Sequence, residues 1–123
     1  MRKLLALAEP PDAVFSASDM SALGAMRALR DLGLHVPDDV AIVGYDDILF
    51  ASISSPTLTT VRQDKDKIGE SACAALIELI EGRASALPEI VFPVELIVRE
   101  SCGGVVGVDD TFGIGLDAVL ARD

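Results

Sequence analysis

The sequence has few aromatic residues, no tryptophan and only two cysteines. Aromatic side chains make up 4% of its 123 residues, so the core has to be built from Leu, Ile, Val and Ala. Cys73 and Cys102 lack the spacing of a metal-binding motif, and idle thiols are typical of a reducing compartment. We therefore expect unpaired thiols, no metal, no cofactor and a cytoplasmic location.

Positive charge and long apolar runs are also scarce. The formal net charge is -10, and a field of that sign repels phosphate backbones and anionic membrane surfaces. No run is long enough to cross a membrane. The apolar residues after Met1 reach Pro10 and Pro11 too soon for a signal peptide. We therefore expect this segment to contact neither DNA nor a membrane directly.

Half of the sequence is hydrophobic, which argues against disorder, and the length suits one ordinary domain. Strand patterns alternate with helix patterns along it. The expected elements are a helix end at 4–7, a strand at 13–17, a helix at 20–32, a strand at 40–43, a helical turn at 50–54, and then a strand at 58–62, a helix at 65–81 and an edge strand at 89–99. Such alternation predicts an α/β fold, with three layers and a mainly parallel sheet.

Caps and breakers support these boundaries. Ser18 or Asp19 can cap the helix at 20–32, and Gly33 suits the position just after it. Asp64 can cap the helix at 65–81, and Pro93 restricts the last strand to an edge or a bend. The helix at 65–81 carries one apolar stripe, formed by Ile68, Ala72, Ala75, Leu76, Leu79 and Ile80.

The stretch from Val40 to Asp47 is the centre of the functional interpretation. A β-branched run is followed by Gly44, Tyr45, Asp46 and Asp47, and ligands of open α/β sheets bind beyond the carboxyl ends of the strands. The pattern thus places an aromatic and two carboxylates where a small molecule would bind. The alternative is that the two aspartates only end the strand and cap the next turn.

Four segments in register resemble one known family. They are Phe15–Leu29, Leu34–Ile48, Pro56–Gln63 and Val98–Ser101, and together they are similar to the effector-binding core of the LacI–GalR transcriptional regulators. The resemblance implies a periplasmic-binding-protein-like, Rossmann-like half of a two-lobed core. Residues 1–102 would be most of its C-terminal lobe, truncated before its first strand. The headpiece, hinge helix and N-terminal lobe would be absent, and the tail at 103–123 has no counterpart.

The family resemblance also implies which residues bind the effector, a sugar, polyol or nucleoside-like molecule. Asp46 matches a strand-end carboxylate that holds ligand hydroxyls or ring nitrogens, and Gln63 matches a polar position lining the cleft. Ser18 stands where the lac repressor has Asn, so the ligand can differ. Asp19 is included in the site, with a supporting role expected rather than a direct contact.

A homodimer is the second implication of the resemblance. The candidate interface residues are Met20, Leu23, Arg27, Phe50 and Ile53. Leu23 and Met26 could instead face the core, and for Met26 this is the favoured alternative. Operator DNA would be contacted only through a headpiece that this chain lacks.

Other functions have weaker support. A hydrolytic set of Ser18, Asp19 and His35 places the histidine at the opposite end of the sheet, so we expect no enzyme and no catalytic residues. Asp19, Asp46 and Asp47 could bind magnesium, but no phosphate-binding pattern accompanies them. The alternative to a regulator module is a fragment of a sugar-binding protein that serves a transporter.

Overall fold

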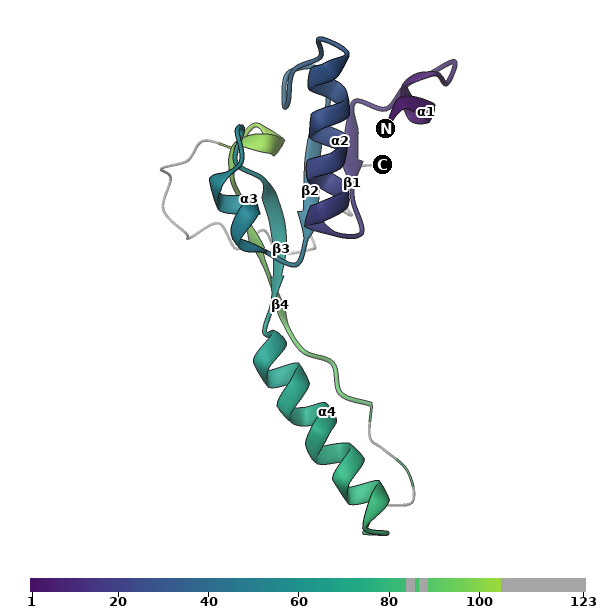
Figure 1. The fold of residues 1–123 in the computed structure, drawn as a ribbon, viewed down its shortest axis with the longest axis vertical. Coiled ribbons are helices and arrows are strands. Elements are labelled where there is room, and N and C mark those ends of the chain that lie inside the picture. Colours follow the sequence, from purple (N-terminus) through teal and green to yellow (C-terminus); the bar gives the residue numbers. More distant parts are fainter. Residues whose placement is uncertain (84–85, 87–88, 105–123) are drawn as a thin grey trace, which may run out of the picture.

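The structure, a computed structural model, describes residues 1–83, 86 and 89–104 (Figure 1). The elements are α1 (Arg2–Leu5), β1 (Ala13–Phe15), α2 (Asp19–Asp31), β2 (Ala41–Tyr45), α3 (Leu49–Ile53), β3 (Thr59–Gln63), α4 (Lys65–Ile80), β4 (Val94–Ile97) and the 3-10 helix η1 (Glu100–Cys102). Each element predicted from the sequence is present, with ends shifted by a few residues. Most of the tail at 103–123 lies outside the described residues.

The strands form one mainly parallel sheet, as predicted. Their order is β1-β2-β3-β4; β1, β2 and β3 run parallel, and β4 pairs antiparallel with β3. The last strand begins directly after Pro93 and lies at an edge, which fits a residue that cannot donate to a ladder. It is shorter than the predicted strand at 89–99, because only Val94–Ile97 find partners on β3.

The core lies between one face of the sheet and the helices α2 and α3. Its buried members are Ala22, Met26, Leu29, Val40, Ile42, Ala51 and Leu58. Met26 is 8% exposed, so the alternative that it faces the core is correct, and Leu23 packs partly against the same cluster. We call the sheet with α2, α3 and η1 the body.

The caps predicted from the sequence are present at both ends of α2. Ser18, not Asp19, is the N-cap of α2, and its Oγ accepts a hydrogen bond from the Ser21 amide at 3.3 Å. Gly33 has φ +76° and follows the helix as predicted, with the Leu34 amide donating back to the Leu29 carbonyl at 3.0 Å.

The segment after β4 is fixed to the sheet by a buried hydroxyl. Ser101 Oγ donates to the Ile42 carbonyl at 2.6 Å and accepts from the Thr59 amide at 2.8 Å. Ser101 is fully buried, so these bonds satisfy a group that would otherwise be costly to bury. The motif at Val98–Ser101 therefore attaches the end of the described chain to the centre of the sheet.

Helix α4 does not pack on the sheet. Figure 1 shows it projecting away from the body along the direction in which β3 leaves it, and none of its residues is buried. Only Asp64, its N-cap, separates it from the end of β3, so no loop is available to turn the helix back over the sheet. The α/β fold and the mainly parallel sheet are as predicted, and α4 does not form a third layer on that sheet.

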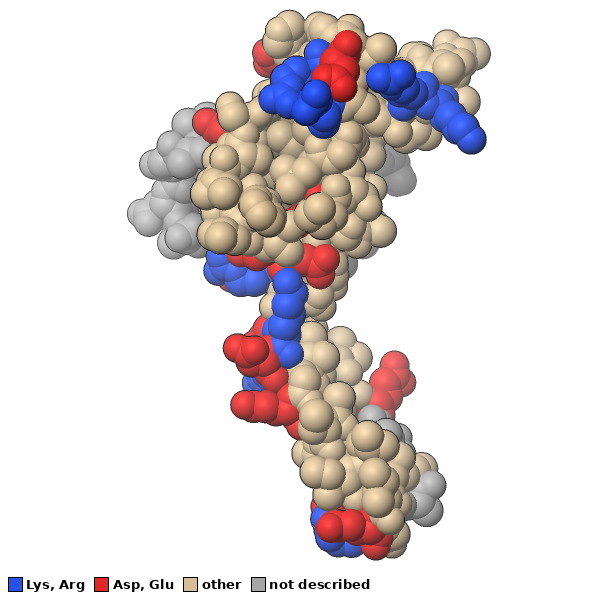
Figure 2. All heavy atoms as spheres, viewed as in Figure 1, with Lys and Arg blue, Asp and Glu red and all other residues tan. Residues whose placement is uncertain are grey.

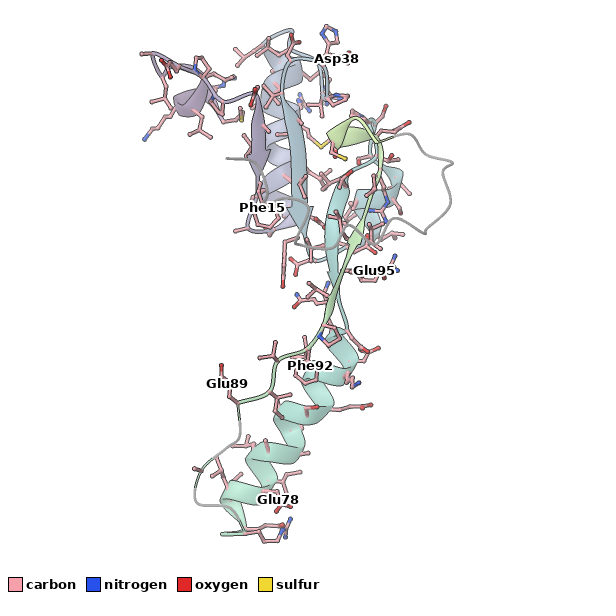
Figure 3. All side chains as sticks on the ribbon, turned by 180° about the vertical axis from the view of Figure 1, so that it is seen from behind. Phe15, Asp38, Glu78, Glu89, Phe92 and Glu95 are labelled. Carbon is pink, nitrogen blue, oxygen red and sulfur yellow. The ribbon has the colours of Figure 1, made fainter. Side chains whose placement is uncertain are left out.

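The second face of the sheet is therefore not covered by α4. Seen from behind, β1 and β2 lie in front of α2 (Figure 3). On this face Phe15 and Tyr45 form an edge-to-face pair with ring centroids 6.5 Å apart, and Phe15 remains 64% exposed. The described residues thus form two layers, the sheet and the pair α2 and α3.

Candidate functional site

The loop after β2 has an unusual backbone. Asp46 has φ +114° and Asp47 has φ +47°, and in the described part of the chain no other residues except glycines have positive φ. Each such conformation costs a non-glycine residue roughly 1–3 kcal/mol unless its surroundings impose it. Two consecutive residues with this backbone distinguish the loop after β2 from a plain strand end.

Asp46 and Gln63, predicted separately as site residues, are brought together. Gln63 Nε2 donates to Asp46 Oδ1 at 2.9 Å, and Lys65 Nζ donates to the Asp46 carbonyl at 2.6 Å. The amide of Asp46 donates to the Val61 carbonyl at 2.9 Å. These contacts exist because β2 and β3 are parallel neighbours that end at the same edge of the sheet.

Asp47 is held by two arginines. Its Oδ1 accepts from Arg99 at 2.7 Å and its Oδ2 accepts from Arg62 at 2.7 Å. Burial acts to raise the pKa of Asp47, but the hydrogen bonds from Arg99 and Arg62 outweigh it, so the pKa lies below its usual value. The carboxylate is charged and fully engaged, and 10% of the side chain is exposed.

These residues border a cavity of about 630 Å³. Its lining consists of Asp46, Asp47, Arg62, Gln63, Asp64, Lys65, Asp66, Pro93, Val94 and Glu95. Figure 2 shows acidic and basic side chains gathered where α4 leaves the body, and Figure 3 places Glu95 at the same junction. The cavity therefore lies at the carboxyl ends of β2 and β3, beside the start of α4.

Asp19 is not at the surface of this cavity. It is fully buried; its Oδ1 accepts from Thr60 Oγ1 at 2.6 Å and its Oδ2 accepts from the Ile48 amide at 2.8 Å. A Cβ at Gly44 would collide with this carboxylate, which explains the glycine. Asp19 thus joins α2 to β3 and to the loop after β2.

Ser18 is likewise outside the cavity lining. Its hydroxyl lies 2.9 Å from Ser21 Oγ and caps α2. Of the four predicted ligand residues, the structure therefore brings Asp46 and Gln63 together at the cavity. Ser18 and Asp19 lie at the neighbouring end of β1.

The predicted dimer residues form an exposed apolar surface. Met20, Leu23, Phe50 and Ile53 line, with Ser54, a shallow cavity of about 390 Å³ between α2 and α3. Met20, Phe50 and Ile53 are each more than half exposed. Arg27 lies beside this surface, in an ion pair of 2.8 Å with Asp31.

The weaker alternatives do not gain support. His35 lies in the turn before β2 and contacts Asp39 at 3.4 Å, remote from Ser18 and Asp19 at the other end of the sheet. The magnesium alternative gains no support, because both oxygens of Asp19 already accept hydrogen bonds inside the protein. Within the described ranges, no group of three metal-binding side chains converges. The helices described there are also too short or too polar to span a membrane.

The sequence interpretation missed Lys65, Thr60 and the partners of Asp47. Arg99 was noted only as part of the closing motif, and Thr60 only as a strand residue. The one available signal was charge. Arg62 lies in β3 and Arg99 follows β4, so both arginines come from segments near the acidic loop after β2. Which aspartate they bind depends on the loop backbone, which the pattern does not specify.

Comparison with known proteins identifies the family. Residues 1–102 match the profile of the periplasmic binding protein-like domain. The HTH-type transcriptional regulator MalR of Streptomyces coelicolor is 47% identical over 95 residues, which cover 77% of this chain and 28% of MalR. The chain spans less than a third of the length of the curated relatives that it matches.

Solved structures agree with this result. A putative LacI transcriptional regulator from Bacillus cereus subsp. cytotoxis is 35% identical, with a TM-score of 0.77 over 85% of this chain and 37% of that one. The regulator CelR in complex with cellobiose is 42% identical, with a TM-score of 0.68 over 73% of this chain and 28% of that one. These similar proteins are regulators and not enzymes. The chain belongs to the periplasmic binding protein-like domain family, and within it to the LacI–GalR transcriptional regulators.

Proposed function

We propose that residues 1–102 are the effector-sensing and dimerisation part of a cytoplasmic LacI-type regulator, and that Asp46 and Gln63 bind the effector. The observation that carries this proposal is their convergence at the cavity between the ends of β2 and β3. Within the described residues, Asp46 Oδ2 accepts no hydrogen bond from a protein donor, so it can accept one from a ligand hydroxyl. The proposed boundary leaves residues 103–123 outside the effector-sensing part.

The charges at the cavity favour a neutral ligand. Five carboxylates line it, and the two cationic side chains there are Arg62 and Lys65. Arg62 is bound to Asp47 and Glu95, and Lys65 to the Asp46 carbonyl. An anionic ligand would therefore meet excess negative charge. A polyol fits better, because its hydroxyls can donate to carboxylates, and CelR with cellobiose supplies a related example.

The projecting helix supports a two-lobed protein. Leu76, Ile77 and Ile80 on α4 are each at least half exposed, which is costly for an amphipathic helix with no partner. We propose that α4 packs on a second lobe, whose residues would supply the other half of the ligand cavity. In such a regulator, ligand binding between the lobes would alter operator affinity through a separate DNA-binding headpiece.

The ligand assignment is tested by Asp46→Ala. A chimera of CelR that carries residues 1–102 at the matching positions provides the second lobe, and cellobiose is the first probe. Loss of a hydrogen bond to a charged group costs about 1.5–3 kcal/mol, so affinity measured by calorimetry should fall roughly ten- to a hundredfold. Asp38→Ala, an exposed aspartate at the far end of the sheet (Figure 3), is the matched control.

Two outcomes would contradict the assignment. Equal affinity of the Asp46→Ala and Asp38→Ala chimeras would remove Asp46 from the site. Preference of the unaltered chimera for glucose 6-phosphate over neutral sugars would contradict the charge argument. If cellobiose does not bind the unaltered chimera, other neutral mono- and disaccharides and nucleosides should be tested as ligands by thermal shift.

The dimer proposal is tested on the chain itself. Ile53→Glu places a charge in the apolar surface between α2 and α3, and it should move the chain from dimer to monomer in light scattering over a dilution series. Leu32→Glu is the control, because Leu32 is 49% exposed and outside that surface. An oligomer that survives Ile53→Glu and dissociates with Leu32→Glu would locate the interface elsewhere.

A further inference from the structure

Asp47 is the one cavity-lining carboxylate whose two oxygens are both occupied by arginines. Arg62 comes from β3, and Arg99 comes from the short segment between β4 and η1. Arg99 also donates to the Leu58 carbonyl at 2.8 Å, so it is itself anchored at the start of β3. The Asp47 carboxylate thus joins the loop after β2 to two other segments of the body.

This engagement makes Asp47 a poor direct contact for a ligand. Its side chain is 10% exposed and that of Arg99 is 15% exposed, whereas Arg62 is half exposed. A ligand hydroxyl would have to displace a charge-assisted bond, which is stronger than a neutral one. Any effect of Asp47 on binding is therefore expected to pass through the residues that it holds or adjoins, which are Arg62, Arg99 and Asp46.

The backbone links the two aspartates. Asp46 at φ +114° and Asp47 at φ +47° are consecutive, so the direction of the Asp46 side chain depends on both residues. Asn and Asp tolerate the left-handed region better than most residues, but the value at Asp46 is outside even that region. Bonds from Val61, Gln63 and Lys65 hold Asp46 itself, and the ion pairs of Asp47 fix the residue that follows it.

We propose that Asp47 is a positioning residue, whose ion pairs with Arg99 and Arg62 hold Asp46 in the conformation that directs its carboxylate to the ligand. This proposal rests on the ligand role proposed for Asp46. The competing explanation is that the Asp46 amide on Val61 and the Ile48 amide on Asp19 hold the loop without Asp47.

The test is Asp47→Asn, studied by NMR on the chain itself. Asn keeps the shape of the side chain and its tolerance of positive φ, so the change removes mainly the ion pairs. The HN–Hα coupling and the 13Cα shift of Asp46 report its φ. Both should move away from their wild-type values, while core signals such as those of Leu29 and Ile42 stay in place. Asp39→Asn, in another turn where the carboxylate accepts a backbone amide, should leave Asp46 unchanged.

Unchanged Asp46 signals in a folded Asp47→Asn chain would overturn the proposal. If that variant does not fold, Arg62→Gln decides, because it removes one half-exposed partner and leaves Arg99 in place. It should shift the Asp46 signals in part. An Asp46 signal identical to wild type in Arg62→Gln would then overturn the proposal.

A binding cycle separates this proposal from the function on which it rests. In the CelR chimera with cellobiose, Asp47→Asn should lower affinity about tenfold alone and no further in the Asp46→Ala background. Equal losses in both backgrounds would mean that Asp47 acts independently of Asp46, and would overturn the proposal. Failure of the unaltered chimera to bind cellobiose would count against the proposed ligand, but the NMR result on the loop would be unaffected.

Discussion

Helices α2 and α4 begin in the same way but differ in how much of their surface the rest of the chain covers. Each follows a strand and starts at a side-chain cap, Ser18 for α2 and Asp64 for α4. The shorter helix α2 buries four residues, whereas the longer helix α4 buries none. The difference shows that an apolar stripe predicts a helix and its inner face, but not which surface will cover that face.

The geometry of the preceding segment decides the outcome. Three residues separate β1 from α2, enough for the chain to turn back over the sheet, and one residue separates β3 from α4. An isolated helix of about 15 residues is marginal in water, and most helical stability in proteins comes from packing. Of the helices that the structure describes, α4 is therefore the one whose stability depends most on a partner outside the chain.

The largest expected effect contrasts a leucine from each helix. Leu29→Ala empties a fully buried site in α2 and should lower the free energy of unfolding by about 2–5 kcal/mol. Leu76→Ala, at a site 55% exposed on α4, should change it by less than about 0.5 kcal/mol. Urea titrations of the isolated chain measure both, and similar losses would show that the α4 face is packed after all.

A second contrast uses one glycine from each region. Alanine at Gly44 would press its Cβ onto Asp19 Oδ1 and within 3.0 Å of Leu58, so we expect a loss of about 1–3 kcal/mol. Gly69 in α4 has nothing within 4 Å of such a Cβ. Alanine favours the helix over glycine by about 1 kcal/mol, so Gly69→Ala should increase the helix content measured by circular dichroism. It should not shift the cooperative unfolding transition of the body. A shift of that transition by Gly69→Ala would mean that α4 unfolds together with the body.

The smallest expected effect is the dependence of the stability of the body on pH. Asp47 has a lowered pKa in the folded chain, so its ionisation stabilises the fold at pH above the usual aspartate value of 3.8 and ceases to do so as pH falls through the lowered pKa. The urea midpoints of wild type and Asp47→Asn should differ at pH 7 and converge in acid. A difference that persists below that pKa would show that the charge of Asp47 is not the cause.

The sequence predicted the elements well because local physics decides them. Caps at Ser18 and Asp64, the glycine at position 33 and the edge-strand proline at position 93 act within a few residues. The direction of α4 was not predicted. It depends on a one-residue connection whose meaning becomes clear only once β3 and the sheet are placed.

Part of the geometry of the candidate site could be predicted from the sequence. Asp46 and Gln63 end adjacent parallel strands, and that relation follows from the order of elements, so their contact could be anticipated. The burial of Asp19 could not, because it depends on Thr60, 41 residues away in sequence, and on the space left by Gly44. The arginine pair on Asp47 likewise depends on where β4 returns to the sheet.

The register between the last two strands gives the projecting segment a simple topology. Gln63 and Val94 are direct partners in the antiparallel pair, so β3 and β4 form a hairpin whose connection happens to contain a whole helix. The chain therefore leaves the sheet after Gln63 and rejoins it beside that residue at Val94. A two-residue turn of the Asn-Gly type is the ordinary way to close such an antiparallel ladder. The body could then be produced as a minimal domain, with the rest of the hairpin connection treated as an interchangeable insertion.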